Sequence, residues 1–467
     1  MKNLIESLPL PAVYYRPETS PCYYRQDDVG KWMKVDLTSV RSFVACQGYD
    51  TRRAEGTTEA DQCVLKLQER QNVAYAGPLA GYRAGLYWMN QNRVLVTESP
   101  RFIEPQAGEW PTLNALLDAM FGDDELGQRD HLLAWWKLAV ASVRAGRVQA
   151  SQMLTLAGPP GSGKSLTQQL ITETLGGRSA KPYLFMCGKT TFNADLFRAE
   201  HLVIDDEAED ITIEKRRHFA ASIKAFCVNP EQHCHGKNKD GLTLTPVWRL
   251  TCSVNDDPER LQVLPPLDDD VADKIIILKV EAGAMPMRSD SPEARAAYWA
   301  RLKAELPAFL HDLDQWKIPE ALRVDRYGLR HFHHPEIVEV LRHATPQMRL
   351  LDLIDEDYFR CPADLAGTRQ RDPWDATAAE IERHLQRLDG PVAKQAGQLL
   401  RHHSNIGDYL GRLFRSQPEE GGRISRRIVN GKTRWTIQPP PLPAPPPRLH
   451  AGPSVEEEPP VCPCPPG

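Results

Sequence analysis

The sequence has no apolar run long enough to cross a membrane, although 41% of its 467 residues are hydrophobic. Its N-terminus also lacks the apolar core of a signal peptide. Its ten cysteines are scattered without regular spacing, which argues against a disulfide framework and indicates free thiols. We therefore expect a cytoplasmic protein that makes no contact with a membrane.

The chain also lacks an excess of positive charge. Lys and Arg number 57 against 62 Asp and Glu, which gives a net charge of −5. This balance excludes a surface that is basic throughout, so any contact with nucleic acid must be confined to local patches. Residues 1–110 contain no paired carboxylates of the kind that hold metal ions in a primase or polymerase. Primase activity is therefore not expected.

What the chain does contain is a glycine-rich segment, residues 158–165, with the sequence Gly-Pro-Pro-Gly-Ser-Gly-Lys-Ser. It follows an apolar run (153–157) that predicts a strand and precedes residues 166–175, which predict a helix. This is the context of a P-loop, where backbone N–H groups and a helix N-terminus bind phosphates. Lys164 is expected to reach the β- and γ-phosphates, and Ser165 to bind Mg²⁺. The residues assigned to the nucleotide are Gly158, Gly161, Ser162, Gly163, Lys164, Ser165 and Leu166.

Two further apolar runs predict buried strands with polar residues at their ends. The first leads into Asp205, Asp206 and Glu207, and the second ends at Val254 and is followed by Asn255. ATP hydrolysis needs one carboxylate for Mg²⁺ and another group to orient the attacking water. We assign Asp205 to the metal and leave open whether Asp206 or Glu207 orients the water. Asn255 is positioned to touch the γ-phosphate or that water.

A helix and a hairpin are predicted between these two strands. Residues 214–227 have helical spacing with basic positions, and residues 231–245 alternate around turn-forming glycines. The tip of the hairpin carries His235, Lys237 and Lys239, which could contact a phosphate backbone or form a solvated polar loop. The basic positions of the helix are Lys215, Arg216, Arg217 and Lys224.

The order of P-loop, acidic strand end, basic hairpin and strand-end Asn resembles the superfamily 3 helicases of the AAA+ class. It is most similar to the helicase module of phage and plasmid primase-helicases, the D5 and NrS-1 polymerase-like group. Residues 191–196, 255–260 and 264–274 also match, and the resemblance covers residues 85–285. It implies an ATP- and magnesium-dependent DNA helicase, in which the hairpin tip contacts DNA.

The resemblance also implies residue roles. Lys164 and Ser165 would bind ATP and magnesium, Asp205 and Asp206 would serve hydrolysis, and Asn255 would sense the γ-phosphate. Many members of the family form rings and place an arginine finger after the strand that carries this Asn. Here the matching region offers Lys274, with Arg260 upstream, so both are candidates for a residue that acts on a neighbouring subunit.

The C-terminal third predicts a winged helix. Three helical segments precede a hairpin with an Asn430-Gly431 turn, and residues 368–436 contain 13 Lys and Arg against 8 Asp and Glu. Arg423, Arg426 and Arg427 are expected to contact DNA phosphates, although such a domain can also serve protein contacts alone.

The expected fold class is α/β, with a P-loop AAA+ core around a parallel sheet, a small N-terminal α+β region and a C-terminal winged helix. Trp135 and Trp136 fall on the apolar face of a predicted helix, which favours packing over base stacking. The expected regions are an accessory region (1–110), a helical lead-in (111–150), the ATPase core (151–285), a helical region (286–367), the winged helix (368–438) and a disordered proline-rich tail (439–467).

These features predict an ATP-driven helicase or translocase that acts on DNA during replication of a phage, plasmid or prophage element. Two alternatives remain open. One is an AAA+ switch that remodels an origin or serves defence without unwinding DNA. The other is a DNA-binding regulator whose nucleotide site has only a structural role.

Overall fold

The computed structural model divides the chain into two compact units, Met1–Ala344 and Thr345–Gly467, which are described separately. The described residues are 10–17, 21–52, 56–205, 213–237, 241–267, 269–343, 346–359, 372–387, 391–400, 405–417 and 422–440. Almost all of the proline-rich tail lies outside these residues, so its predicted disorder stays a prediction. No helix in the described part of the chain is long and apolar enough to cross a lipid bilayer.

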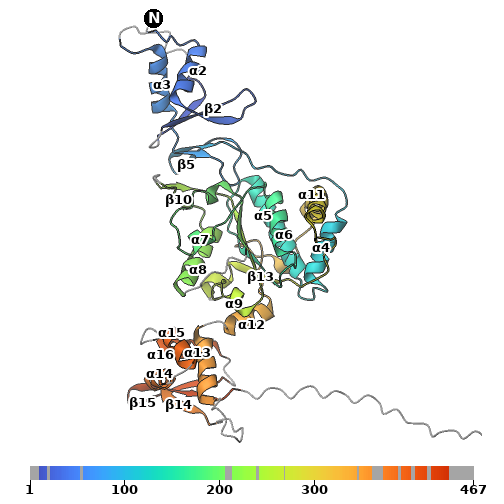
Figure 1. Ribbon diagram of the computed structural model, residues 1–467, viewed down its shortest axis with the longest axis vertical. Coiled ribbons are helices and arrows are strands. Elements are labelled where there is room, and N and C mark those ends of the chain that lie inside the picture. The colour runs from blue at the N-terminus through green and yellow to red at the C-terminus, as the bar shows by residue number, and fades with distance from the viewer. Residues whose placement is uncertain are drawn as a thin grey trace, which may run out of the picture. The chain divides into compact units, whose positions relative to one another are not determined.

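A five-stranded parallel sheet forms the centre of the first unit, in the order β13-β7-β12-β9-β8 (Figure 1). Its strands are β7 (Met153–Ala157), β8 (Ser179–Ala180), β9 (His201–Asp205), β12 (Arg249–Val254) and β13 (Ile275–Lys279). All five strands are short, and all except β8 are mostly buried, because helices cover both faces of the sheet. The predicted α/β fold with a central parallel sheet is thereby confirmed, and the three strands predicted from their apolar runs are present.

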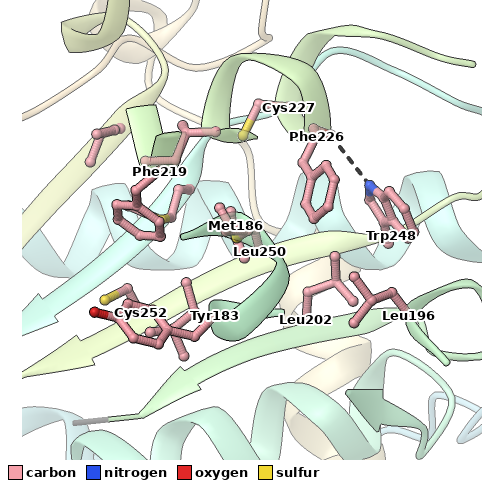
Figure 2. Packing of buried hydrophobic residues seen from close by; sticks show 14 of the residues in the cluster. Tyr183, Met186, Leu196, Leu202, Phe219, Phe226, Cys227, Trp248, Leu250 and Cys252 are labelled. Carbon is pink, nitrogen blue, oxygen red and sulfur yellow. Dashed lines mark hydrogen bonds between the residues drawn. The ribbon is translucent and has the colours of Figure 1, made fainter. Parts of the chain in front are cut away.

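Helices cover the two faces of this sheet as two groups (Figure 1). Alternate residues of a strand point to opposite faces, so Leu154 packs with the first group and its neighbour Met153 with the second. Figure 2 shows the hydrophobic core between the sheet and the second group of helices, where the indole N–H of Trp248 donates to the carbonyl of Phe226 at 3.3 Å. The first group is α4 (Pro111–Phe121), α5 (Gln128–Ala145), α6 (Lys164–Thr174) and α11 (Pro292–Gln315), and the second is α7 (Tyr183–Met186) and α8 (Ile213–Val228).

The paired tryptophans of α5 are core residues. Trp135 and Trp136 are buried, and their indole N–H groups donate to the Gln152 carbonyl and the Thr174 hydroxyl, each at 2.8 Å. Both polar ends are therefore satisfied inside the protein. The interpretation as a packed helix face is confirmed, and neither ring is available to stack on a base.

The N-terminal region has its own small core and two three-stranded sheets. Fully buried Glu200 accepts a hydrogen bond from the Gly81 N–H at 2.9 Å and forms an ion pair with Arg178, which fixes the chain after β4 against the central sheet. The elements are β1 (Val13–Arg16), β2 (Cys22–Gln26), β3 (Trp32–Val35), α2 (Leu37–Cys46), α3 (Glu59–Arg70), β4 (Tyr75–Gly77), β5 (Gly85–Met89) and β6 (Asn92–Val96).

The region expected as one helical domain, residues 286–367, is divided between the two units. Helix α11 packs on α4, α5 and α6, and residues 332–334 extend the edge of the sheet through hydrogen bonds with Ile277. The other elements of the first unit are η1 (Leu196–Arg198), β10 (Gln232–Cys234), β11 (Leu242–Leu244), α9 (Pro258–Leu261), α10 (Asp269–Ala272), η2 (Glu320–Leu322) and α12 (Pro335–His343).

The second unit combines helices with an antiparallel sheet of order β14-β16-β15, which is the outline of a winged helix. Thr377 caps α14 through a reciprocal hydrogen-bond pair with Glu380, which is the capping box of a helix N-terminus. Sequence reasoning missed β14, because four residues after a proline carry little strand signal. The elements are α13 (Pro346–Ile354), η3 (Asp355–Phe359), β14 (Trp374–Thr377), α14 (Ala378–Gln386), α15 (Pro391–Leu399), α16 (Asn405–Ser416), β15 (Ile424–Val429) and β16 (Lys432–Ile437).

The hairpin turn of this unit allows a stability test. Gly431 has φ +74° in the two-residue turn, whereas Gly397 lies in α15 with open space around it. Gly431→Ala should lower the free energy of unfolding by about 1 kcal/mol, because an L-residue is strained in the left-handed region. Gly397→Ala should raise it by about 0.5 kcal/mol, because alanine restricts the unfolded chain and favours a helix. Calorimetry of the two variants should show opposite shifts; shifts of the same sign would contradict the turn assignment.

Candidate nucleotide-binding site

The three predicted polar segments meet at one edge of the central sheet. Strand β12 lies between β7 and β9, with Val254 beside Ala157 and Ser253 beside Asp205. Because these strands are parallel, their carboxyl ends lie together, and the P-loop, Asp205 and Asn255 all follow from there. Residues far apart in the sequence therefore form one site.

The glycines of the loop before α6 have distinct physical roles. A Cβ atom on Gly158 would lie 2.2 Å from the Val280 carbonyl oxygen, so only glycine fits where the loop leaves β7. Gly161 and Gly163 have φ values of +78° and +86°, which glycine adopts without strain. The Ser162 hydroxyl closes the turn by donating to the Pro159 carbonyl at 2.8 Å. This backbone has the form of a phosphate-binding loop at a helix N-terminus.

Lys164 is the first residue of α6, and its ammonium group lies within the loop. It is only 7% exposed and donates to the carbonyls of Gly158 and Pro159 at 2.6 and 2.7 Å. The Asn255 side-chain oxygen lies 3.3 Å away. A nearly buried ammonium within a loop of this form makes strong, charge-assisted hydrogen bonds to an anionic ligand. The site therefore suits a phosphate group.

Asp205 accepts hydrogen bonds from two hydroxyls. Ser165 donates to its Oδ1 at 3.0 Å from α6, and Ser253 donates to the same oxygen at 2.7 Å from β12. Carboxylate and hydroxyl oxygens at such separations are the hard ligands that Mg²⁺ prefers. The residues present thus fit a magnesium ion beside the loop. Sequence reasoning missed Ser253, whose place one residue before the strand end was the available signal.

These residues line a cavity of about 750 Å³, within the usual size range for small-molecule sites. All the assigned P-loop residues except Gly158 line it, together with Asp205 and Asn255. The rest of the lining was not predicted. It consists of Pro160, Gln169 and Ser253 near the loop, Met285 and Ser289 from the segment before α11, and Arg295, Ala296, Tyr298 and Trp299 from α11. Sequence reasoning missed this second wall because nothing local connects α11 with a P-loop.

A buried network behind the cavity holds α6 against β9 and β12. His201 is fully buried, and its ring nitrogens lie 2.7 Å from the Thr172 hydroxyl and 2.9 Å from the Thr251 hydroxyl. The Gln168 amide donates to the same Thr251 hydroxyl and to the carbonyl of Ile204. The helix that begins with Lys164 and the strand that ends with Asp205 are thereby fixed relative to each other.

Several predicted residues cannot be placed. Asp206, Glu207 and Lys239 lie outside the described residues, so their roles stay predictions.

The two candidate trans-acting residues differ in their surroundings. Lys274 is 8% exposed and donates to the Asp273 carboxylate at 2.6 Å and the Asp270 carbonyl at 2.7 Å. It precedes β13, whose first residue pairs with Met153 at the start of β7, so it lies at the edge of the sheet opposite the P-loop. Arg260 is exposed on α9. Burial and these two hydrogen bonds argue against Lys274 as the residue that reaches a neighbour, and the role of Arg260 stays a prediction.

The predicted hairpin is formed by β10 and β11, and the segment before β9 is bonded to the end of β10 that leads into the hairpin tip. Asn193 donates to the His233 carbonyl at 2.9 Å and accepts from the His235 N–H at 2.7 Å. The ring of His235 lies 5.3 Å from that of Phe192, while Lys237 is exposed near the tip.

The predicted basic face of α8 is wrong at one position. Arg216 is buried and donates to the Leu264 carbonyl at 3.0 Å, so it braces the chain after β12. The helical spacing alone could not show that this side of α8 packs inward.

The arginines of the winged helix make ordered contacts within their own unit. Arg423 pairs with Asp355 through two hydrogen bonds, and Arg427 pairs with Asp375. The guanidinium of Arg426 lies 5.2 Å from the centre of the Phe414 ring. These contacts position the arginines on the hairpin, and their binding to DNA stays a prediction.

Comparison with known proteins supports the fold. No protein-family model and no curated protein matches the sequence. The apo C-terminal region of NrS-1 matches with a TM-score of 0.52 and 10% identity, over 94% of this chain and 98% of that chain. Its A form matches over the same shares with a TM-score of 0.51 and 9% identity. The helicase Cch of SCCmec type IV matches over 91% of this chain and 92% of its own, with 8% identity and a TM-score of 0.38.

The chain therefore shares the fold of the NrS-1 C-terminal region, and the resemblance inferred from the sequence is confirmed at the level of fold.

The buried network predicts a pH dependence of stability. Burial lowers the pKa of His201 from its usual value near 6.5 to about 3. Between these values the unfolded chain binds a proton that the folded chain does not. The free energy of unfolding should therefore fall as the pH drops below 6.5, by up to about 1.4 kcal/mol per pH unit.

His201→Gln should flatten this slope in urea unfolding between pH 5 and 7.5, at some cost in stability at neutral pH. The pKa values of His131, His333 and His334 are also lowered by burial, so the change relative to the parent slope is the quantity to compare. His311→Gln, at a half-buried position on α11, is the matched control. An unchanged slope in His201→Gln would contradict the assignment of a neutral buried His201.

Proposed function

We propose that this protein is an ATP-dependent DNA helicase or translocase that serves replication of a phage, plasmid or prophage element. The observation that carries the proposal is the meeting of Lys164, Ser165, Asp205 and Asn255 at one cavity of nucleotide size. A fold shared with the NrS-1 C-terminal region agrees with it. The cytoplasm is the compartment that such a role requires.

Each group in the cavity has a chemical task in this proposal. The Lys164 ammonium would leave its carbonyl partners and neutralise the β- and γ-phosphates, while loop N–H groups bind the phosphate oxygens. Ser165 and Asp205 would hold Mg²⁺, which neutralises developing phosphate charge during hydrolysis. Asp206 or Glu207 would orient the attacking water. Asn255, next to Lys164, would contact the γ-phosphate and so distinguish ATP from ADP.

Direct contacts suggest how hydrolysis could move DNA. Strand β9 carries Asp205 at its end, and the segment before it holds the β10–β11 hairpin through Asn193. A shift of β9 on loss of the γ-phosphate would therefore pull on the hairpin that bears Lys237. We infer that the hairpin follows single-stranded or forked DNA, and that subunits form a ring in which Arg260 reaches the neighbouring cavity.

The first test is removal of the phosphate-binding charge. Lys164→Ala should lower ATP turnover by roughly two orders of magnitude or more, because the phosphates lose their buried cation. Asp206→Asn should keep ATP binding and lose turnover. Lys31→Ala, an exposed lysine in the N-terminal region, is the matched control and should keep the parent rate.

Turnover should be measured with and without single-stranded DNA, alongside particle mass with ATP. Parent-level hydrolysis in both variants would refute the site. Turnover without strand displacement would favour an AAA+ switch, and a monomer in the presence of ATP and DNA would exclude the ring.

The second test concerns the hairpin. Lys237→Ala with Lys239→Ala should weaken binding to single-stranded DNA and reduce the slope of log affinity against log salt. The loss of two phosphate contacts should lower the magnitude of this slope by about 1.4, because each phosphate contact to single-stranded DNA releases about 0.7 counterions on binding. The double variant Lys31→Ala with Lys34→Ala removes the same charge from exposed positions elsewhere. If both double variants change the slope equally, the hairpin is not the DNA site.

A further inference from the structure

The second wall of the cavity belongs to helix α11. Arg295, Ala296, Tyr298 and Trp299 line the same space as the P-loop. A triphosphate on the loop would extend its nucleoside into the rest of a cavity of about 750 Å³, whose size suits a whole nucleotide. The α11 wall is therefore where a base and ribose would meet the protein.

Trp299 is held in place on this wall. Its indole is half-buried against the core that α11 shares with α5 and α6. The Lys303 ammonium lies 5.8 Å from the centre of its ring and forms an ion pair with Glu173 of α6 at 3.3 Å. Contacts to core and cation limit its rotation, so it offers a pre-ordered aromatic surface. Such surfaces stack on the flat faces of nucleobases.

Tyr298 adds a polar group to the wall. Its side chain is 3% exposed, and among the described residues its hydroxyl has no hydrogen-bond partner. Burial raises the pKa of Tyr298 to about 12, so the hydroxyl stays protonated at neutral pH. An unsatisfied buried hydroxyl is costly unless a ligand or water binds it.

We propose that Trp299 and Tyr298 form the nucleoside-recognition wall of this cavity, and that it selects purine over pyrimidine nucleoside triphosphates. The indole stacks on the base, where the two-ring face of a purine overlaps it more fully, and the tyrosine hydroxyl hydrogen-bonds to the nucleoside. This inference rests on the proposed ATPase function and adds that the site recognises the nucleoside as well as the phosphates.

The test compares a nucleotide with its phosphate chain alone. Affinities of Mg-ATP, Mg-CTP and Mg-tripolyphosphate are measured by calorimetry for the parent, Trp299→Ala, Trp299→Phe, Tyr298→Phe and Lys164→Ala. Trp299→Ala should lower the affinity for ATP by about tenfold and leave the affinity for tripolyphosphate within about twofold of the parent value. The difference between the affinities for ATP and CTP should become smaller. Trp299→Phe should keep most of the ATP affinity. Tyr298→Phe should lower the affinity for ATP several-fold and leave the affinity for tripolyphosphate unchanged. Trp88→Ala, at a 67%-exposed position, is the control.

Three results would overturn the inference. If Trp299→Ala lowers the affinities for ATP and tripolyphosphate equally, the indole only supports the fold. If it lowers neither affinity, the base lies elsewhere. Equal affinity of the parent for ATP and CTP refutes purine selection without any variant, so a folding failure of Trp299→Ala leaves the inference testable. Failure of the proposed function itself would give a different result. Either the parent would bind neither ATP nor tripolyphosphate, or Lys164→Ala would leave both affinities unchanged.

Discussion

The site depends on one constraint, the position of β12 between β7 and β9. Hydrogen bonds of two parallel ladders place Ser253 beside Asp205 and Val254 beside Ala157, within about 5 Å by strand spacing. This order brings the P-loop, the acidic strand end and Asn255 together. The buried network of His201, Thr251 and Gln168 strengthens this order, because its side chains join α6 to both neighbouring strands.

The charged groups at this edge suit the nucleotide that we propose. Lys164 is almost fully buried among carbonyl oxygens, and Asp205 is bound by hydroxyl donors. A cation and an anion thus line the same cavity, and their hydrogen bonds hold both in position. A phosphate chain with Mg²⁺ provides both charges in a single ligand, and preorganised groups bind it with little rearrangement.

The parts around the core connect to this edge by specific contacts. Asn193 joins the hairpin to the segment before β9, and Glu200 joins the N-terminal region to the start of β9. Strand β9 and the segment before it therefore contact the cavity, the hairpin and the accessory region. In the winged helix, by contrast, Asp355 and Asp375 hold arginines of the hairpin, so any DNA surface there is arranged by internal ion pairs.

Local patterns determined much of this protein. Apolar runs followed by glycines or carboxylates identified the core strands, the P-loop and Asp205, and the Asn-Gly pair identified the winged-helix turn, because each depends on neighbours in the chain. Tertiary structure alone decided that Tyr298 and Trp299 face the P-loop cavity and that Arg216 and Lys274 are buried. These outcomes depend on which surfaces pack together, and packing partners far apart in the sequence leave no local periodicity to read.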